Sequence, residues 1–210
     1  MRQANVQLKS DRRVSILDAA ERCFARSGFH GASMQDICAE AGMSPGNLYR
    51  YFPSKEAIIS GICERNRAQA AEDFLAVDRA GGFFEGLAGL ARYHLVDRPD
   101  EHAALCADIV AECRRNPQIA RMHEEIERDV VARLVDMLRR AAERGEISAE
   151  LDLEKAAAML MVLGDGMSWR RMSDRTFDAQ ALLPYLMHMV RCLLTQPPRP
   201  DGADDMETPR

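Results

Sequence analysis

Three polar side chains in one short stretch of the sequence have the chemistry to contact a nucleic acid. When Leu48 and Phe52 anchor a helix from one face, helical spacing leaves Asn47, Arg50 and Tyr51 pointing outward. Amide, guanidinium and phenol groups donate hydrogen bonds to phosphate oxygens and to base edges in a major groove. The same spacing also fits a plain helical corner whose polar side chains are solvated. The neighbouring elements of the chain are needed to distinguish a DNA-contacting helix from such a corner.

Two short predicted helices with a glycine-containing turn between them would position these side chains. The first begins after Ser33 and the second after Ser44, and both serines can accept hydrogen bonds from the exposed amides of a first helical turn. Pro45 falls in the first position of the second helix, where its missing N–H costs nothing. The arrangement at residues 33–52, packed by an earlier helix at residues 12–27, predicts a helix-turn-helix.

The rest of the sequence also predicts helices. Apolar residues recur at spacings of three and four, and strand signals are nearly absent. Glycines or prolines end the periodic segments, as Gly28 and Gly42 do in the first two. We therefore predict an all-α fold of about nine helices, divided into an N-terminal head (residues 1–55), a larger helical body (residues 56–196) and a disordered tail (residues 197–210).

Composition and charge restrict the class of protein. The 210 residues are 47% hydrophobic and 29% charged, which is an ordinary globular balance. No apolar run reaches the ~18 residues of a membrane span, and the first residues lack the apolar core of a secretory signal, so we expect a soluble cytoplasmic protein. Residues 1–55 carry eight Lys and Arg against five Asp and Glu, whereas residues 56–210 carry 20 against 28. The balance indicates that only the basic head contacts a polyanion.

Residues typical of enzymes and metal sites are scattered. The six cysteines form no C-x-x-C pair, and the five histidines fit no metal-ligand spacing with a cysteine or carboxylate. We find no nucleophile–base signature and no phosphate-binding loop, so we predict no enzyme, cofactor or metal site. Cys106 and Cys113 share one helix face but lie about 10 Å apart along its axis, too far for a direct disulfide. A thiol or metal sensor stays an open alternative.

Residues 12–62 resemble the DNA-binding domain of the TetR family of bacterial transcriptional regulators. The match covers about a quarter of the chain and follows the family pattern in order and spacing at Ile16 to Ala20, Phe24, Gly28, Phe29, Gly31, Ile37 to Gly42, Ser44, Gly46, Leu48, Tyr49, Tyr51, Phe52, Lys55 and Glu56. The resemblance implies a homodimer that binds double-stranded DNA, with two recognition helices in successive major grooves about 34–36 Å apart.

The resemblance also implies which residues of the head contact the operator DNA. Arg50 can read guanine through O6 and N7 or can contact phosphate, whereas Tyr49 and Tyr51 suit phosphate or a thymine methyl group. Lys55 matches a phosphate-contacting lysine of the family. The predicted DNA-binding set is Ser33, Gln35, Ser44, Pro45, Gly46, Asn47, Tyr49, Arg50, Tyr51 and Lys55.

The resemblance is looser in the body, where it implies a dimer interface and an effector site. Residues 153–172 and 177–194 are apolar nearly all round, so each helix needs both a core and a partner, and we predict that they form the dimer. Asp165 fits a counter-charge for a cationic ligand or an ordinary solvated carboxylate. The methionines fit a ligand wall or, more commonly, core and interface packing. The candidate ligand-binding residues are Phe83, Phe84, Tyr93, His94, Met122, Met137, Met167 and Trp169.

Together these features predict a one-component regulator that represses transcription and responds to a ligand. The apo dimer would bind a pseudo-palindromic operator, and a small effector would release it by stabilising a body conformation in which the two heads are wrongly spaced. The acidic body and the methionine-rich helices favour a hydrophobic or cationic effector, and hence control of an efflux pump. A redox or metal sensor on the same scaffold, and an activator, are the alternatives.

Overall fold

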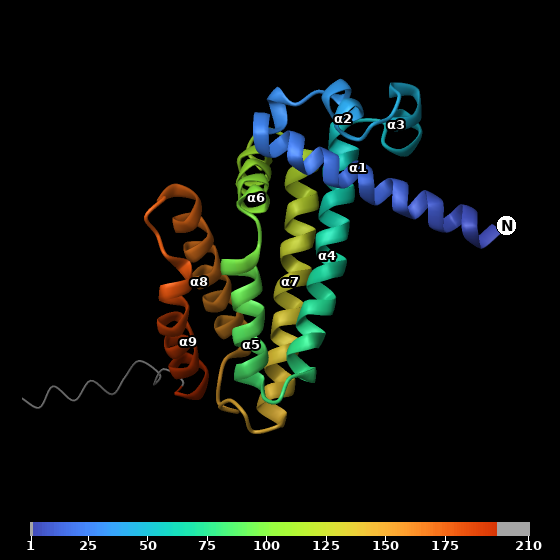
Figure 1. Cartoon of the computed structure of the whole chain (residues 1–210). Coiled ribbons are helices and arrows are strands. Elements are labelled where there is room, and N and C mark those ends of the chain that lie inside the picture. The colour runs from blue at the N-terminus through green and yellow to red at the C-terminus, as the bar shows by residue number, and fades with distance from the viewer. Residues whose placement is uncertain (1, 197–210) are drawn as a thin grey trace, which may run out of the picture.

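The computed structural model describes residues 2–196, which form helices joined by short loops (Figure 1). The described residues contain nine α-helices, one π-helical turn and no strand, which confirms the predicted all-α fold. The tail predicted to be disordered, residues 197–210, lies outside the described residues. None of the described helices combines the length and the apolarity that a membrane span requires.

Three helices build the head and lie together at one end of the molecule (Figure 1): α1 (Arg2–Gly31), α2 (Met34–Glu40) and α3 (Pro45–Tyr51). The predicted helix-turn-helix is therefore present as α2 and α3, and α1 packs against α2. α1 is longer than the predicted 12–27, and its N-terminal part extends away from the other elements. Gly28 interrupts it with a φ of +68°, the left-handed conformation expected of a glycine at a helix end.

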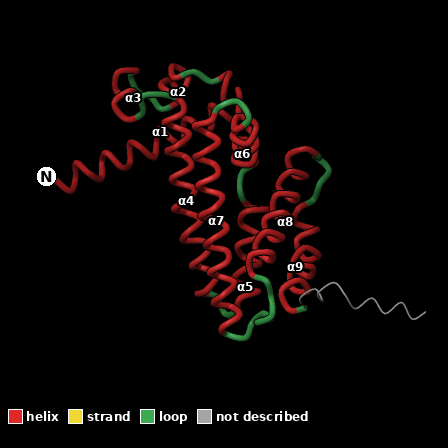
Figure 2. Tube along the Cα trace, turned by 180° about the vertical axis from the view of Figure 1, so that it is seen from behind, coloured by secondary structure: helices red, strands yellow, loops and turns green. Residues whose placement is uncertain are grey.

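Six α-helices and the π-helical turn build the body: α4 (Lys55–Arg79), α5 (Phe83–Arg92), η1 (Tyr93–Asp97), α6 (Asp100–Cys113), α7 (Pro117–Glu143), α8 (Leu153–Ser173) and α9 (Ala179–Thr195). Figure 2 shows, as Figure 1 does from the other side, that α4 and α7 run side by side along the body. α6 rises from the body to contact α1, and α8 and α9 pair on the side away from α4. The segments predicted to dimerise are thus α8 and α9.

Local hydrogen bonds and turns fix the helices of the head. Ser33 caps α2, since its hydroxyl accepts from Asp36 N at 3.1 Å while Ser33 N donates to the Asp36 carboxylate at 2.8 Å. Pro45 occupies the first turn of α3 directly after Ser44, as the sequence predicts, but the Ser44 hydroxyl makes no capping hydrogen bond, so that part of the prediction is wrong. Gly42 has a φ of +62° in the turn between α2 and α3, a conformation that glycine adopts without a Cβ penalty. The turn therefore follows from residues that the sequence already displays.

Two clusters of buried side chains hold the helices together. The head cluster joins α1, α2 and α3 to the first turns of α4, and it includes Leu105 and Ile109 of α6 and Ile119 of α7. The body cluster lies among α4, α5, α7, α8 and α9 around Phe83 and Met137. The head and the body therefore share apolar packing across the predicted boundary at residue 55, so a change of packing in α6 or α7 reaches the head.

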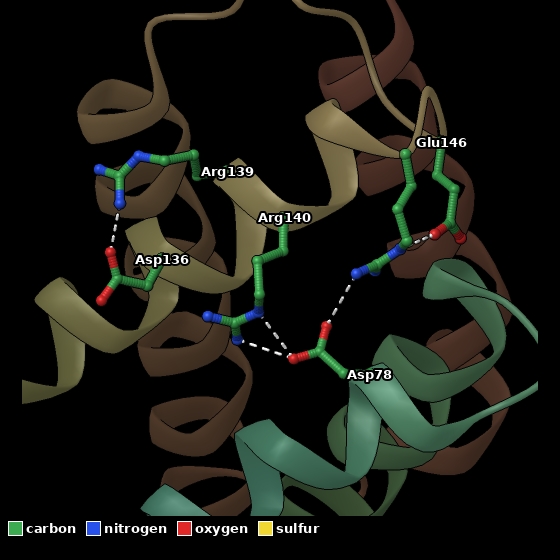
Figure 3. Close-up of polar contacts among 6 residues, drawn as sticks. Asp78, Asp136, Arg139, Arg140 and Glu146 are labelled. Carbon is green, nitrogen blue, oxygen red and sulfur yellow. Dashed lines mark hydrogen bonds and ion pairs between the residues drawn. The ribbon is translucent and has the colours of Figure 1, made fainter.

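A polar network closes the end of the body far from the head (Figure 3). The Asp78 carboxylate of α4 accepts from Arg140 at 2.8 Å and from Arg144 at 3.3 Å, both near the end of α7. Arg144 also pairs with Glu146, and Glu146 Oε2 accepts from Phe83 N at 2.5 Å at the start of α5. The network fixes the ends of α4, α5 and α7 relative to one another.

Candidate DNA-binding surface and effector region

Two apolar side chains anchor the short helix α3. Leu48 is fully buried and Phe52, at the C-cap, is 1% exposed, which holds a helix of only seven residues in place. Tyr49 is 51% exposed and Arg50 is exposed as well, so α3 presents a phenol and a guanidinium to the outside. The prediction that Tyr51 points outward is wrong, because Tyr51 follows Leu48 by three residues, shares its face and packs against the head cluster. Tyr49 is therefore the more accessible of the two tyrosines.

The other residues predicted to contact DNA lie at the first turns of α2 and α3. Asn47 is half-buried, and the rest are exposed: Ser33, Gln35, Ser44, Pro45 and Gly46. Apart from the chain neighbours of Gly46 and the backbone of its own helix, no described atom lies within 4 Å of the place that a Cβ would take there, so a phosphate backbone has room to approach. Hydrogen bonds from Ser33 to Asp36 hold the pKa of that carboxyl below its usual range, which keeps the cap of α2 intact into mild acid.

Lys55, the first residue of α4, clamps the end of α1. Its Nζ donates to the carbonyl of Phe29 at 2.6 Å and to the carbonyl of Ala32 at 2.8 Å, and it lies 4.7 Å from the centre of the Phe29 ring. A lysine ammonium has three donor hydrogens, and the clamp uses two of them. The third hydrogen is available for the predicted phosphate contact. Nothing in the sequence indicates the clamp.

Ion pairs that sequence reasoning missed brace α1 against α2. Glu40 of α2 pairs with Arg22 and with Arg26 of α1, each at 2.7 Å. Hydrogen bonds from these two arginines, with Arg22 as the larger contributor, hold the pKa of the Glu40 carboxyl below its usual range. Elsewhere on α1, the Arg13 guanidinium lies 4.5 Å from the centre of the Phe52 ring. The only signal in the sequence is that Arg22 and Arg26 stand one helical turn apart.

The structure does not bring the eight predicted effector residues together. Phe83 and Met137 are almost completely buried in the body cluster, whereas Met122 packs against the head cluster. Tyr93 is exposed, and Trp169 is 61% exposed on α8. A surface hollow along α7, lined by Glu127, Arg128, Val131, Ala132, Val135, Asp136, Arg139 and Glu154, contains none of the eight. Two more of the eight border the body cluster, namely Phe84 and Met167.

His94, the eighth candidate, belongs to a polar network around the π-helical turn η1. Its Nε2 lies 3.0 Å from the Asp73 carboxylate of α4, and Arg98 Nη1 donates to its Nδ1 at 3.4 Å. These contacts assign the proton to Nε2, and burial, followed by the charge of Arg98, lowers the pKa of His94. From α8, Arg171 donates to the carbonyls of Leu95 and Arg98 at 3.2 and 2.6 Å. A π-helical turn is rare and often lies at a functional site.

Exposed apolar side chains follow α8 and α9. The large ones are Met159, Val162, Trp169, Leu182, Tyr185 and Met189. Apart from chain neighbours and the backbone of α8 itself, a Cβ added at Gly164 or Gly166 would meet no described atom within 4 Å, so this part of α8 is open to the outside. An apolar surface that runs over two packed helices is typical of an interaction site.

Two family models match the chain. The model described as bacterial regulatory proteins, tetR family, matches residues 16–62, which include most of the head and the start of α4. The model described as BetI-type transcriptional repressor, C-terminal, matches residues 90–195, about half of the chain. The two models together cover the helix-turn-helix and most of the body.

Individual relatives agree with these matches. The HTH-type transcriptional regulator UidR from Escherichia coli (strain K12) is 34% identical over 158 residues, which are 73% of this chain and 78% of UidR. The solved structure of Salmonella enterica GusR is 34% identical, with a TM-score of 0.75 over 88% of this chain and 95% of GusR. A regulator from Saccharomonospora viridis, solved in complex with choline, shares the fold at 23% identity and a TM-score of 0.72, over 86% and 96% of the two chains. The chain therefore belongs to the TetR family and is a DNA-binding transcriptional regulator rather than an enzyme.

Proposed function

We propose that this regulator is a ligand-responsive repressor that binds a pseudo-palindromic operator as a homodimer. The observation that carries the proposal is the presence of two separate exposed surfaces, a polar one on α3 and an apolar one on α8 and α9. The first has the groups that contact phosphates and base edges in a major groove. The second has the composition that a subunit interface buries.

A second copy of the chain is the partner that best fits α8 and α9. Tyr185 is 71% exposed and Trp169 is also largely exposed, so a lone protomer leaves two large aromatic side chains in water. Pairing α8 and α9 with the same two helices of another protomer gives a four-helix interface with two-fold symmetry. Gly164 and Gly166 would let the two backbones approach closely. Such a dimer carries two copies of α3, as a pseudo-palindromic operator requires.

An effector in the body would act on the head through α4 and α6. α4 begins beside α1 and runs down the body along α7, while α6 supplies Leu105 and Ile109 to the head cluster. Repacking in the body therefore shifts the elements that support α3. The effector shifts the equilibrium only by binding more tightly to the state with wrongly spaced heads. The match to a BetI-type repressor model and the choline complex of a structural neighbour support repression by a protein that binds a small molecule.

A thiol sensor on the same scaffold has less support. Burial raises the pKa of Cys106 and of Cys113, and it raises the pKa of Cys63 to about 12. A raised pKa leaves less thiolate at pH 7, and thiolate is the form that reacts with oxidants and binds metals. The chemistry of these thiols therefore favours a small organic effector.

A mobility shift with DNA from upstream of the protein's own gene, measured over a series of salt concentrations, tests the proposal. We expect a discrete complex that survives excess competitor DNA and weakens steeply with salt. If this DNA gives no complex, selection from random DNA should still yield a two-fold symmetric sequence. No complex from either source would refute operator binding, and a complex that contains a single protomer would refute the dimer.

A further inference from the structure

We propose that the effector carries a carboxylate group, which Arg98 binds where η1, α6 and α8 meet. We call this place the Arg98 junction, and it comprises His94, Arg98, His102, Cys106 and Asp165. The inference rests on the proposed ligand-responsive function and adds the chemical class of the ligand. It differs from the hydrophobic or cationic effector that composition favours.

Arg98 supplies a fixed positive charge at this junction. Its carbonyl accepts from Arg171 Nη2 at 2.6 Å, which ties its backbone to α8. Its guanidinium donates to the neutral Nδ1 of His94 at 3.4 Å and lies 5.9 Å from the centre of the Tyr93 ring. Among the residues whose side chains the structure describes, no carboxylate pairs with Arg98. The planar guanidinium fork matches a carboxylate in geometry and charge, so Arg98 can still bind one.

The adjoining side chains of α6 are neutral hydrogen-bonding groups. His102 Nε2 lies 3.5 Å from Cys106 Sγ, one helical turn along α6. Burial lowers the pKa of His102 to about 4, and the nearby charge of Arg98 contributes to the shift. Burial also raises the pKa of the Cys106 thiol. Both groups are therefore uncharged at pH 7, and a neutral imidazole can donate to or accept from a ligand.

The junction is accessible from solvent. The side chain of Cys106 is exposed, and the side chains of His94, Arg98 and His102 are half-buried. A small molecule can therefore reach the guanidinium of Arg98 and the thiol of Cys106 without a large rearrangement of the helices.

The acidic side chains near the junction leave room for an anion. Asp165 of α8 and Glu21 of α1 both act electrostatically on Cys106. Glu21 pairs with Arg65 at 2.7 Å, which offsets its charge. Burial raises the pKa of Asp165, because it disfavours the charged carboxylate, so this side chain is easier to protonate than an exposed aspartate. Since Asp165 can accept a hydrogen bond, we expect a polar carboxylate with a hydroxyl or ammonium group rather than a fatty acid.

A carboxylate on Arg98 would change how η1 is held against α4. Arg98 donates to His94, and His94 in turn holds Asp73 of α4 at 3.0 Å. A ligand that takes the guanidinium weakens this link, and the same helix α4 carries the Lys55 clamp at its other end in the head. The ligand would then make different contacts in the DNA-bound and the released conformations, and a ligand can release DNA only through such a difference.

A carboxylate tethered to Cys106 can replace the unidentified ligand. At an alkaline pH, where the thiolate of Cys106 forms, iodoacetate alkylates it with loss of iodide and leaves a carboxymethyl group, whereas iodoacetamide leaves a neutral group of nearly the same size. Peptide mass spectrometry gives the extent of modification at each of the six cysteines. DNA selected by the unmodified protein then reports affinity in a mobility shift. We expect the carboxymethyl protein to bind this DNA about tenfold more weakly than the iodoacetamide-treated protein.

Matched variants assign the effect to the junction. Arg98→Gln and Cys106→Ser should each abolish the difference between the two reagents, and Cys192→Ser should leave it unchanged. Arg98→Lys, which keeps the charge without the fork, should retain part of it and serves as a second variant if Arg98→Gln does not fold. Alkylation with 2-bromoethylamine, which attaches a cation, should not release the DNA.

Three results would overturn the inference. They are equal effects of iodoacetate and iodoacetamide when both have fully modified Cys106, a difference that persists in Arg98→Gln, and release of DNA by the cationic adduct. A protein that selects no DNA before any alkylation would instead refute the proposed function, so the two failures are distinguishable.

Discussion

His30 at the end of α1 and Glu112 near the end of α6 join the head to the body through a contact of 2.7 Å between Nε2 and Oε2. The two partners differ in their surroundings, because Glu112 is 6% exposed whereas His30 is exposed. One turn earlier on α6, Asp108 Oδ2 lies 3.5 Å from the place that a Cβ would take at Gly28. The end of α1 is therefore held on α6 by a polar contact in addition to the shared head cluster.

Removal of His30 should destabilise the protein more than neutralisation of Glu112. His30→Ala leaves a buried carboxylate without its partner, and we expect the free energy of unfolding to fall by about 1–3 kcal/mol. Glu112→Gln removes the charge that needs the partner and should cost less. Urea unfolding followed by circular dichroism, at one fixed protein concentration, measures both variants. A larger loss of unfolding free energy in Glu112→Gln than in His30→Ala would show that Glu112 does not depend on His30 as its partner.

Neighbouring residues of α3 should separate DNA binding from folding. Tyr49→Ala removes an exposed phenol and should weaken operator binding about tenfold or more while the unfolding transition stays the same. Leu48→Ala empties a fully buried position and should lower the free energy of unfolding by about 2–5 kcal/mol. Mobility shifts and thermal melts of both variants provide the comparison. Full operator affinity in Tyr49→Ala would show that α3 is not the recognition helix.

Lys55→Met should reveal the clamp on the end of α1. The variant loses two hydrogen bonds from a charged donor, and we expect the free energy of unfolding to fall by about 1–3 kcal/mol. If the third N–H also reaches phosphate, the slope of log affinity against log salt should become shallower by about one. A variant as stable as the wild type would contradict the clamp, and an unchanged slope would contradict the phosphate contact.

The network at the far end of the body should weaken in acid. The Arg144 side chain, with Phe83 N–H, holds the pKa of Glu146 below its ordinary value of 4.5. Because the folded pKa is lowered, the stabilisation is present above the ordinary value and is lost as the pH falls through the folded one. The stability difference between wild type and Glu146→Gln should therefore shrink as the pH drops below the ordinary value of 4.5. A difference that stays constant from neutral pH into acid would refute this assignment.

A charge on the apolar face of α9 should separate the protomers. Tyr185→Glu places a carboxylate where the proposed interface would bury it, and we expect monomers in sedimentation velocity at micromolar concentration. Leu75→Glu, at another exposed apolar position on α4, is the matched control and should remain dimeric. Dimers of Tyr185→Glu would place the interface elsewhere.

Much of the head could be predicted because local rules determine it. Ser33 acts through its capping hydrogen bond, and Gly42 and Pro45 act through backbone preferences, all over a few residues. The anchoring of α3 by Leu48 follows from helical spacing in the same way. Local information therefore sufficed to place the helix-turn-helix and to give the all-α fold.

The contacts between distant elements could not be predicted from one sequence. His30 and Glu112 are 82 positions apart, and neither residue type nor spacing indicates that they meet. The same is true of Lys55, whose partners are backbone carbonyls. The predicted effector residues are apolar and aromatic side chains that recur on the middle helices, together with Met167 and Trp169 of the methionine-rich helix α8. Periodicity shows that such residues face inward, but it does not show which of them converge, and Phe83 and Met137 proved to be core. The π-helical turn adds one residue within a helical pattern, which periodicity does not resolve.

A hydroxyl-radical footprint on DNA selected by the protein tests the central claim most directly. Two recognition helices in one dimer should protect two patches whose centres lie about 10 base pairs apart, and Tyr49→Ala should lose both patches together. A single protected patch, or two patches at a spacing unrelated to the helical repeat, would contradict a dimer that reads successive major grooves with α3.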